Sequence, residues 1–143
     1  EAAYFSRCFQ DRRPVDAEGF RAALVEGYTW LPGVEPILQD LKARGVRMCA
    51  ASNYPVWWRL IEAKLSLSRF LEWGFVSCQT GVRKPDAEAF LAPARALGVE
   101  PGDCLFVDDR RDNVDAARAL GMSSHRFRGA DGLRVALEAV GLL

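Results

Sequence analysis

The hydrophobic and polar positions alternate between helical spacing and short continuous apolar runs through most of the chain. The segment 34–44 has apolar residues at helical intervals, and Gly45 stands where a left-handed cap would end a helix. The run 46–51 is short and mostly apolar, as in a buried strand, and it leads into the polar pair Ser52 and Asn53. A helix followed by a strand begins an α/β alternation.

The same alternation continues to the C-terminal end. Helical spacing predicts further helices at 55–65, at 85–97 with Pro85 in the first turn, at 113–120, and from Asp131 onward. Short apolar runs predict strands at 75–77, 105–107 and 125–127. Helices between strands imply a parallel sheet with helices on both faces, so the expected fold is a three-layer, Rossmann-like α/β/α core.

Residues before Trp30 follow a different pattern. Aromatic and apolar residues recur there at helical spacing, with no strand signal. The sequence therefore predicts an all-helical appendage at 1–29 and an α/β core at 30–143.

Composition and charge exclude several classes of function. Half of the 143 residues are apolar, which is enough for the core of one domain. Lys and Arg together number 19, as do Asp and Glu, and no basic block occurs, so we expect neither a nucleic-acid surface nor a polybasic membrane anchor. The apolar runs are too short to span a membrane, and no charged-then-apolar leader opens the chain.

The cysteines and the single histidine predict no zinc site. Cys8, Cys49, Cys78 and Cys104 are widely spaced without a C-x-x-C motif, and His125 has no Cys or His near it in sequence. Because Cys49 and Cys104 lie in apolar strand-like runs, we expect reduced, buried thiols and a reducing compartment.

Polar residues stand at the ends of three successive predicted strands: Ser52 with Asn53, then Lys84, then Asp108 with Asp109. In an open parallel sheet such ends converge on one crevice. A hydroxyl and an ammonium neutralise phosphoryl oxygens, and paired carboxylates bind Mg²⁺ through hard oxygen ligands. The set predicts a site for a phosphate group and magnesium.

Each of these residues also has an ordinary structural explanation. Ser52 and Asn53 suit a helix cap, and Lys84 suits a solvated loop. Asp108 and Asp109 suit the N-terminal end of the following helix. Two adjacent carboxylates after an apolar strand still favour a cation, because like charges at close range repel unless a positive group lies nearby. Their joint order at strand ends favours the functional interpretation.

This order of motifs resembles the haloacid dehalogenase superfamily. Its second, third and fourth motifs resemble Ser52, Lys84 within G-V-R-K-P-D, and F-V-D-D-R-R-D-N-V-D-A-A-R-A-L-G-M. The stretches E-G-Y-T-W-L-P-G-V-E and S-N-Y-P-V-W-W-R-L-I-E-A-K-L-S-L-S further resemble the flavin mononucleotide hydrolases of plant chloroplasts. The resemblance implies a Mg²⁺-dependent phosphatase acting on a small phosphorylated metabolite, flavin mononucleotide in particular. It also implies a chloroplast location, with the cytoplasm as the alternative.

The resemblance assigns roles residue by residue. It implies that Ser52 and the backbone of Asn53 bind phosphoryl oxygens, and that Lys84 steadies the nucleophile and the phosphoryl group. It implies that Asp109 binds Mg²⁺ directly, while Asp108 supports the metal or a coordinated water. These assignments match the interpretation from residue types alone.

Further residues are expected around this set. The resemblance implies that Asn113 orients the acidic loop. Tyr54, Trp57 and Trp58 directly follow the phosphate loop, and aromatic faces stack well on a flavin ring. Core packing is the alternative for the tryptophans, but either one alone would complete a buried stripe with Ile61. One Trp or Tyr54 is therefore a candidate for substrate binding.

One part of the family pattern does not occur in the chain. Superfamily members open with a strand ending in D-x-D, whose first Asp attacks phosphorus and whose second is a general acid and base. The chain contains no D-x-D, and Asp11, Asp16 and Asp40 follow no apolar strand. We expect that the central first strand is missing, that 1–29 is a partial helical cap, and that the chain alone is inactive. The strands flanking the gap would then present unpaired edges, unless another segment fills it or they pair directly.

Two other classes are alternatives. A signalling receiver domain also combines paired acids, a hydroxyl residue and a lysine, but its acid pair comes first and its lysine last. A catalytically dead member of the superfamily, kept as a binding or scaffold protein, is the second alternative. The coding sequence directly upstream of Glu1 would separate a truncated enzyme from a degenerate one.

Overall fold

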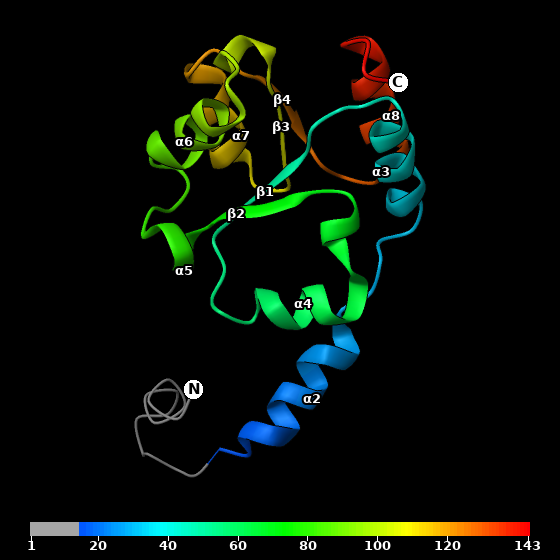
Figure 1. The fold of residues 1–143 in the computed structure, drawn as a ribbon, viewed down its shortest axis with the longest axis vertical. Coiled ribbons are helices and arrows are strands. Elements are labelled where there is room, and N and C mark those ends of the chain that lie inside the picture. Colours follow the sequence, from blue (N-terminus) through cyan, green and yellow to red (C-terminus); the bar gives the residue numbers. More distant parts are fainter. Residues whose placement is uncertain (1–14) are drawn as a thin grey trace.

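The computed structural model describes residues 15–143 and shows an α/β body with one helix projecting from it (Figure 1). The predicted alternation of helices and strands from residue 34 onward is confirmed. In chain order the elements are α2 (Ala17–Gly27), α3 (Val34–Ala43), β1 (Cys49–Ser52), α4 (Trp58–Leu65), the 3₁₀ helix η1 (Leu67–Arg69), β2 (Glu72–Val76), α5 (Ser77–Thr80), α6 (Glu88–Leu97), the 3₁₀ helix η2 (Pro101–Asp103), β3 (Leu105–Asp108), α7 (Arg111–Ala119), β4 (Ser123–Arg126) and α8 (Ala130–Ala139).

The strands form two separate parallel pairs. β1 pairs with β2, placing Ala51 opposite Phe75, and β3 pairs with β4, placing Phe106 opposite Ser124. Among residues 15–143, no strand pairs with the second edge of β1 or of β3. Direct pairing between these two strands, one of the predicted ways to close the sheet, is therefore not found.

Helices cover both faces of the paired strands (Figure 1). On one face, buried residues of α3 and α8 pack against Met48, before β1, and against Leu105 and Val107 of β3. On the other face, residues of α6 and α7 pack around Phe106 of β3. The buried residues of these two clusters are Ile37, Leu41, Leu133 and Leu137, and Phe90, Ala94, Ala117 and Met122. The first cluster thus joins two strand pairs that share no backbone ladder.

Several element boundaries differ from the predictions. Pro85 lies in a turn, and α6 begins at Glu88. The last helix begins at Ala130, after Gly129, and not at Asp131. The short helix α5 was not predicted. The left-handed conformation at Gly45 is confirmed, with φ of 78°.

The N-terminal segment is helical where the structure describes it. Asp16 caps α2, because its Oδ1 accepts a hydrogen bond of 2.8 Å from the backbone N–H of Gly19. The helix packs against α4 and points away from the strands (Figure 1). Residues 1–14, with Asp11 and Cys8, lie outside the described residues, and the division into 1–29 and 30–143 stays a prediction. No helix in the described part is long and apolar enough to cross a membrane.

Candidate active site

A buried ion pair connects the C-terminal ends of β1 and β3. Lys84 lies in the loop between α5 and α6, and its Nζ is 2.6 Å from the carbonyl oxygen of Ala51 and 2.5 Å from Oδ2 of Asp108. The side chains of Lys84 and Asp108 are only 10% and 7% exposed. The alternative of a solvated loop lysine is therefore wrong. Lys84 holds together the two strand ends from which the predicted site residues come.

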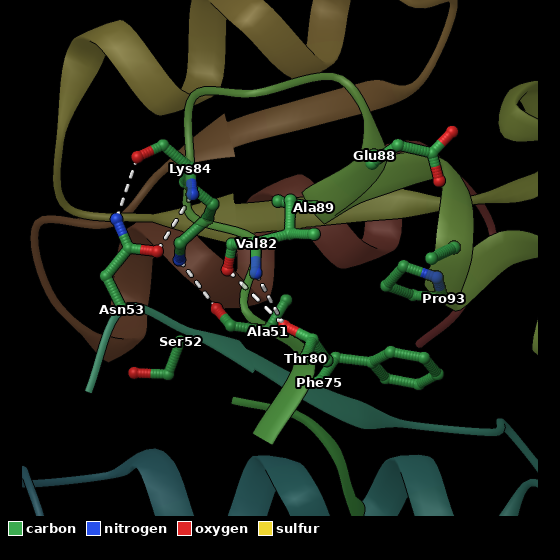
Figure 2. A pocket seen from close by; sticks show the side chains of 11 residues that line it. Ala51, Ser52, Asn53, Phe75, Thr80, Val82, Lys84, Glu88, Ala89 and Pro93 are labelled. Atoms are coloured by element: carbon green, nitrogen blue, oxygen red, sulfur yellow. Dashed lines mark hydrogen bonds between the residues drawn. The ribbon is translucent and has the colours of Figure 1, made fainter. Parts of the chain in front are cut away.

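Asn53 fixes the backbone that carries Lys84. Its side-chain amide donates to the carbonyl of Lys84 at 2.8 Å, and its Oδ1 accepts from the N–H of Lys84 at 2.8 Å (Figure 2). Helix α4 has Trp57 at its N-cap and no side-chain cap, so the helix-cap explanation of Ser52 and Asn53 is wrong. The Ser52 hydroxyl at the end of β1 makes no hydrogen bond within residues 15–143, and Ser52 lines a pocket.

The two acids after β3 have different surroundings. Oδ1 of Asp108 accepts from the N–H of Arg110 at 2.8 Å, and the Asn113 amide donates to both carboxylate oxygens at 3.1 and 3.2 Å. Burial alone would raise the pKa of Asp108, but the hydrogen bonds from Lys84, Arg110 and Asn113 and the charge of Lys84 outweigh it and lower that pKa. Asp108 is therefore an ionised carboxylate whose two oxygens are already engaged.

Asp109 is exposed and differently placed. Its backbone carbonyl accepts a hydrogen bond of 3.0 Å from Nε of Arg126. Its carboxylate has no hydrogen-bond partner in the described part of the chain. Of the two adjacent acids, Asp109 is thus the one with oxygens available for a cation.

The aromatic residues after the phosphate loop point toward the N-terminal helix. The hydroxyls of Tyr54 and Tyr28 are 2.8 Å apart, and the rings of Trp57 and Phe20 have centroids 5.6 Å apart. Trp58 instead packs on Trp73, near the start of strand β2, with ring centroids 5.2 Å apart. Trp58 is therefore the tryptophan used in packing near the sheet, and Trp57 is the one directed to α2.

A pocket lies beside Lys84 on the α6 side of β1 (Figure 2). Lys84 and Asn53 stand at one end, and Phe75 with Pro93 makes the other end apolar. The full lining consists of Ala51, Ser52, Asn53, Phe75, Thr80, Val82, Lys84, Glu88, Ala89, Ala92 and Pro93. Of the residues predicted to bind phosphate or substrate, Ser52, Asn53 and Lys84 thus border this pocket, whereas Tyr54 and Trp57 do not line it.

Asp108 and Asp109 could supply some, but not all, of the oxygen ligands of a magnesium ion. Asp108 and Asp109 are hard oxygen donors of the kind Mg²⁺ prefers, but no group of three or more His, Cys, Asp or Glu gathers anywhere in residues 15–143. Asp16 caps α2, and Asp40 pairs with Arg134 at 3.3 Å. The further oxygen ligands that Mg²⁺ requires would therefore come from water, from a phosphate, or from a segment outside the described residues.

A model of the haloacid dehalogenase-like hydrolase family matches residues 6–121. The chain belongs to this family. It is 44% identical over 134 residues to flavin mononucleotide hydrolase 1, chloroplastic, of Arabidopsis thaliana, an alignment that covers 94% of the chain and 55% of that relative. It is 37% identical over 103 residues to phosphoglycolate phosphatase 1 of Pseudomonas aeruginosa, covering 70% of the chain and 36% of that relative. The chain therefore spans about half, or less, of these relatives.

Solved structures of family members share the fold. A hydrolase from Streptococcus pneumoniae superposes with a TM-score of 0.73 at 25% identity, covering 82% of the chain and 62% of that structure. A family enzyme from Bacteroides thetaiotaomicron, in complex with magnesium and inorganic phosphate, superposes with a TM-score of 0.68 at 20% identity, covering 90% and 71%. These likenesses show that the chain shares the fold of the two structures, and the Bacteroides enzyme holds magnesium and phosphate on that fold.

The structure joins some of the predicted residues and separates others. Asn53, Lys84, Asp108 and Asn113 form one hydrogen-bonded set, with Ser52 and Asp109 directly beside it in the chain. Tyr54 and Trp57 face α2. Sequence analysis did not select Tyr28 or Ser77, which contact Tyr54. Tyr28 counted only as one apolar residue of a helical pattern, and no local signal pairs it with a residue 26 positions later.

Proposed function

We propose that the chain carries the phosphate- and magnesium-binding half of a phosphomonoester hydrolase that converts flavin mononucleotide to riboflavin. The observation that carries this proposal is the buried ammonium of Lys84 between the carbonyl of Ala51 and the carboxylate of Asp108, beside Ser52. Membership of a hydrolase family and the similarity to the Arabidopsis enzyme support the reaction class and the substrate. The same relative supports a chloroplast location.

The chain's own residues would bind the phosphoryl group. The hydroxyl of Ser52 and the N–H of Asn53 donate hydrogen bonds to phosphoryl oxygens, and Lys84 supplies a positive charge. Because Asn53 and Asp108 fix Lys84 on two sides, its charge needs no rearrangement as negative charge develops on phosphorus. Preorganised charge of this kind is a large part of catalysis in phosphoryl transfer.

Asp109 would bind the metal, and Asp108 would fix the position of the Lys84 ammonium. Magnesium, when bound, neutralises the charge on the phosphoryl oxygens. The Asp109 carboxylate supplies one oxygen ligand, since it has no competing partner among the described residues. Asp108 keeps Lys84 in place, and Asn113 keeps Asp108 in place.

The attacking carboxylate comes, in this proposal, from an aspartate outside the chain. That aspartate bonds to phosphorus as the phosphate ester bond breaks, the ribityl oxygen takes a proton from the second aspartate of the D-x-D motif, and riboflavin leaves. Water then gives a proton to the second aspartate as it attacks the aspartyl-phosphate, which releases inorganic phosphate and regenerates the first carboxylate. In residues 15–143 no strand pairs with the second edge of β1 or of β3, which supports a position between Ser52 and Asp108 for a strand that carries this aspartate. The 143-residue chain alone is then expected to be inactive.

Substrate preference tests the proposed function. We expect the full-length gene product, with Mg²⁺, to have a higher kcat/KM for flavin mononucleotide than for phosphoglycolate, measured as phosphate release. Higher kcat/KM for phosphoglycolate would assign the chain to the other reaction found among its relatives. Binding of both compounds without release of phosphate from either would favour a catalytically dead binding protein.

The role of Asp109 is tested with one substitution and a matched control. In the full-length gene product, Asp109→Asn should abolish Mg²⁺-dependent turnover and weaken Mg²⁺ binding in a calorimetric titration, while the urea midpoint stays unchanged. Asp112→Asn is the control, because Asp112 is also an exposed acid close to Asp109, in the first turn of α7, but is paired with Arg110 at 2.6 Å. Unchanged Mg²⁺ binding in Asp109→Asn, or equal losses in both variants, would show that the metal is held elsewhere.

A further inference from the structure

Helix α2 touches the candidate site at two aromatic contacts. Tyr28 directly follows the last residue of α2, and its hydroxyl lies 2.8 Å from that of Tyr54. Phe20, in the middle of α2, meets Trp57 with ring centroids 5.6 Å apart. Tyr54 and Trp57 are both in the segment that leads from the phosphate-binding residues to α4. These four rings, called here the aromatic wall, lie in and against the segment that directly follows Ser52 and Asn53.

The backbone of Tyr54 is fixed independently of its side chain. Its N–H donates to Oγ of Ser77 at 3.1 Å, and the Ser77 hydroxyl lies 3.4 Å from its carbonyl. The side-chain amide of the preceding residue, Asn53, makes two hydrogen bonds to the backbone of Lys84, one to its carbonyl and one from its N–H. Loss of a contact at the Tyr54 ring would thus leave the phosphate-binding backbone in place and would release only the aromatic side chain.

The contact between the two tyrosines joins their hydroxyl groups. Burial, followed by the hydrogen bond with Tyr54 and the electrostatic effect of that residue, raises the pKa of Tyr28 to about 12. One phenol donates and the other accepts, so each ring is held in one orientation. The helix end that carries Tyr28 is itself attached to α4, where Nζ of Lys64 donates to the carbonyls of Val25 at 2.5 Å and Glu26 at 2.9 Å.

We propose that Tyr28 is a positioning residue which, through its hydroxyl contact with Tyr54, sets the aromatic wall that binds the ring of the leaving group. This inference rests on the proposed function, because a planar aromatic leaving group is what such a wall would recognise. Tyr28 acts on the ring portion of the substrate and not on the phosphate. The two portions can be probed separately with the two reaction products, riboflavin and inorganic phosphate.

The experiment measures two dissociation constants in the full-length gene product, one for riboflavin and one for inorganic phosphate. Riboflavin is titrated by quenching of its fluorescence, and inorganic phosphate is titrated by calorimetry in the presence of Mg²⁺. In Tyr28→Phe we expect riboflavin binding to weaken about 3- to 10-fold, the usual effect of one neutral hydrogen bond. Phosphate binding should stay unchanged. Tyr54→Phe should give the same change, and the double variant should be no weaker than either single variant.

Ser68→Ala is the matched control, because it also removes one hydroxyl hydrogen bond, to Glu62 at the opposite end of α4. It should change neither constant. Equal weakening of riboflavin and phosphate in Tyr28→Phe, or additive losses in the double variant, would show a general structural role and overturn the inference. So would unchanged riboflavin binding in Tyr28→Phe. Absence of riboflavin binding to the unsubstituted protein would instead reject the flavin substrate, and the inference with it.

Discussion

Replacing Lys84 by Met should strongly destabilise the protein, because it leaves a buried carboxylate without its cation. Asp108 is 7% exposed, and Met has nearly the length of Lys without its charge. Removing one partner of a buried ion pair costs about 3–5 kcal/mol, against a total stability of about 5–15 kcal/mol for a typical domain. The remaining donors, Arg110 and Asn113, offset part of this loss, so we expect a value near the lower end, about 3 kcal/mol.

The effect should depend on pH in a definite direction. In the unsubstituted protein the pKa of Asp108 is lowered, so its contribution to stability is present above the unfolded value of about 3.9 and is lost as the pH falls through the folded pKa. Without Lys84, burial raises that pKa, and Asp108 takes up a proton more readily. The difference in unfolding free energy between Lys84→Met and the unsubstituted protein should therefore be largest at pH 7 and should become smaller as the pH falls toward about pH 4.

Urea unfolding followed by tryptophan fluorescence measures this difference at both pH values. Arg95→Met is the matched control, because Arg95 and Glu88 form an ion pair whose side chains are 60% and 57% exposed, and it should lose only about 0–1 kcal/mol. The double variant Lys84→Met/Asp108→Asn should be more stable than Lys84→Met, since no unpaired charge is left. A loss in Lys84→Met as small as that of the control, or one that does not narrow at lower pH, would refute the reasoning.

Two further predictions concern stability in the same assay. Asn113→Ala should lower the free energy of unfolding by about 1–3 kcal/mol, because Asn113 is 3% exposed and donates to both oxygens of Asp108. A smaller decrease would mean that Asp108 does not depend on this amide. Gly45→Ala should cost about 1–2 kcal/mol for its left-handed backbone alone, with φ of 78° and open space around a new Cβ. Gly33→Ala should cost more, because at φ of 77° its Cβ would also lie 2.8 Å from that of Ala130, and equal losses in the two glycine variants would contradict this.

Much of the fold could be predicted because its signals are local. The apolar spacing over 34–44 and the short run that ends at Ser52 each lie within one element, and both appear as α3 and β1. The meeting of Lys84 with the ends of β1 and β3 could also be predicted from the order of the elements. The predicted strand-end position of Lys84 is wrong, because Lys84 lies in the loop between α5 and α6. The structure adds the reason, which is the bridge from Ala51 to Asp108.

Features that depend on distant residues could not be predicted from these patterns. The start of α6 is one case: Pro85 is compatible with a first helical turn, but Lys84 and Pro85 lie in a turn whose backbone is bound by Asn53, and the helix begins only at Glu88. The contact between Tyr28 and Tyr54 is another, because the spacing of Tyr28 fits an ordinary packed helix. The unequal surroundings of Asp108 and Asp109 likewise appear only once α7 brings Asn113 beneath the first of them.

Phosphate release from flavin mononucleotide tests the central claim most directly. It should be measured with Mg²⁺ for the full-length gene product, for its Asp109→Asn variant, and for the 143-residue chain alone. We predict that the full-length product releases riboflavin and phosphate in equal amounts, that Asp109→Asn does not, and that the chain alone stays at the level of a buffer control. Turnover by the chain alone would show that its own residues contain the nucleophile, and full activity of Asp109→Asn would show that the metal site has been placed on the wrong residue.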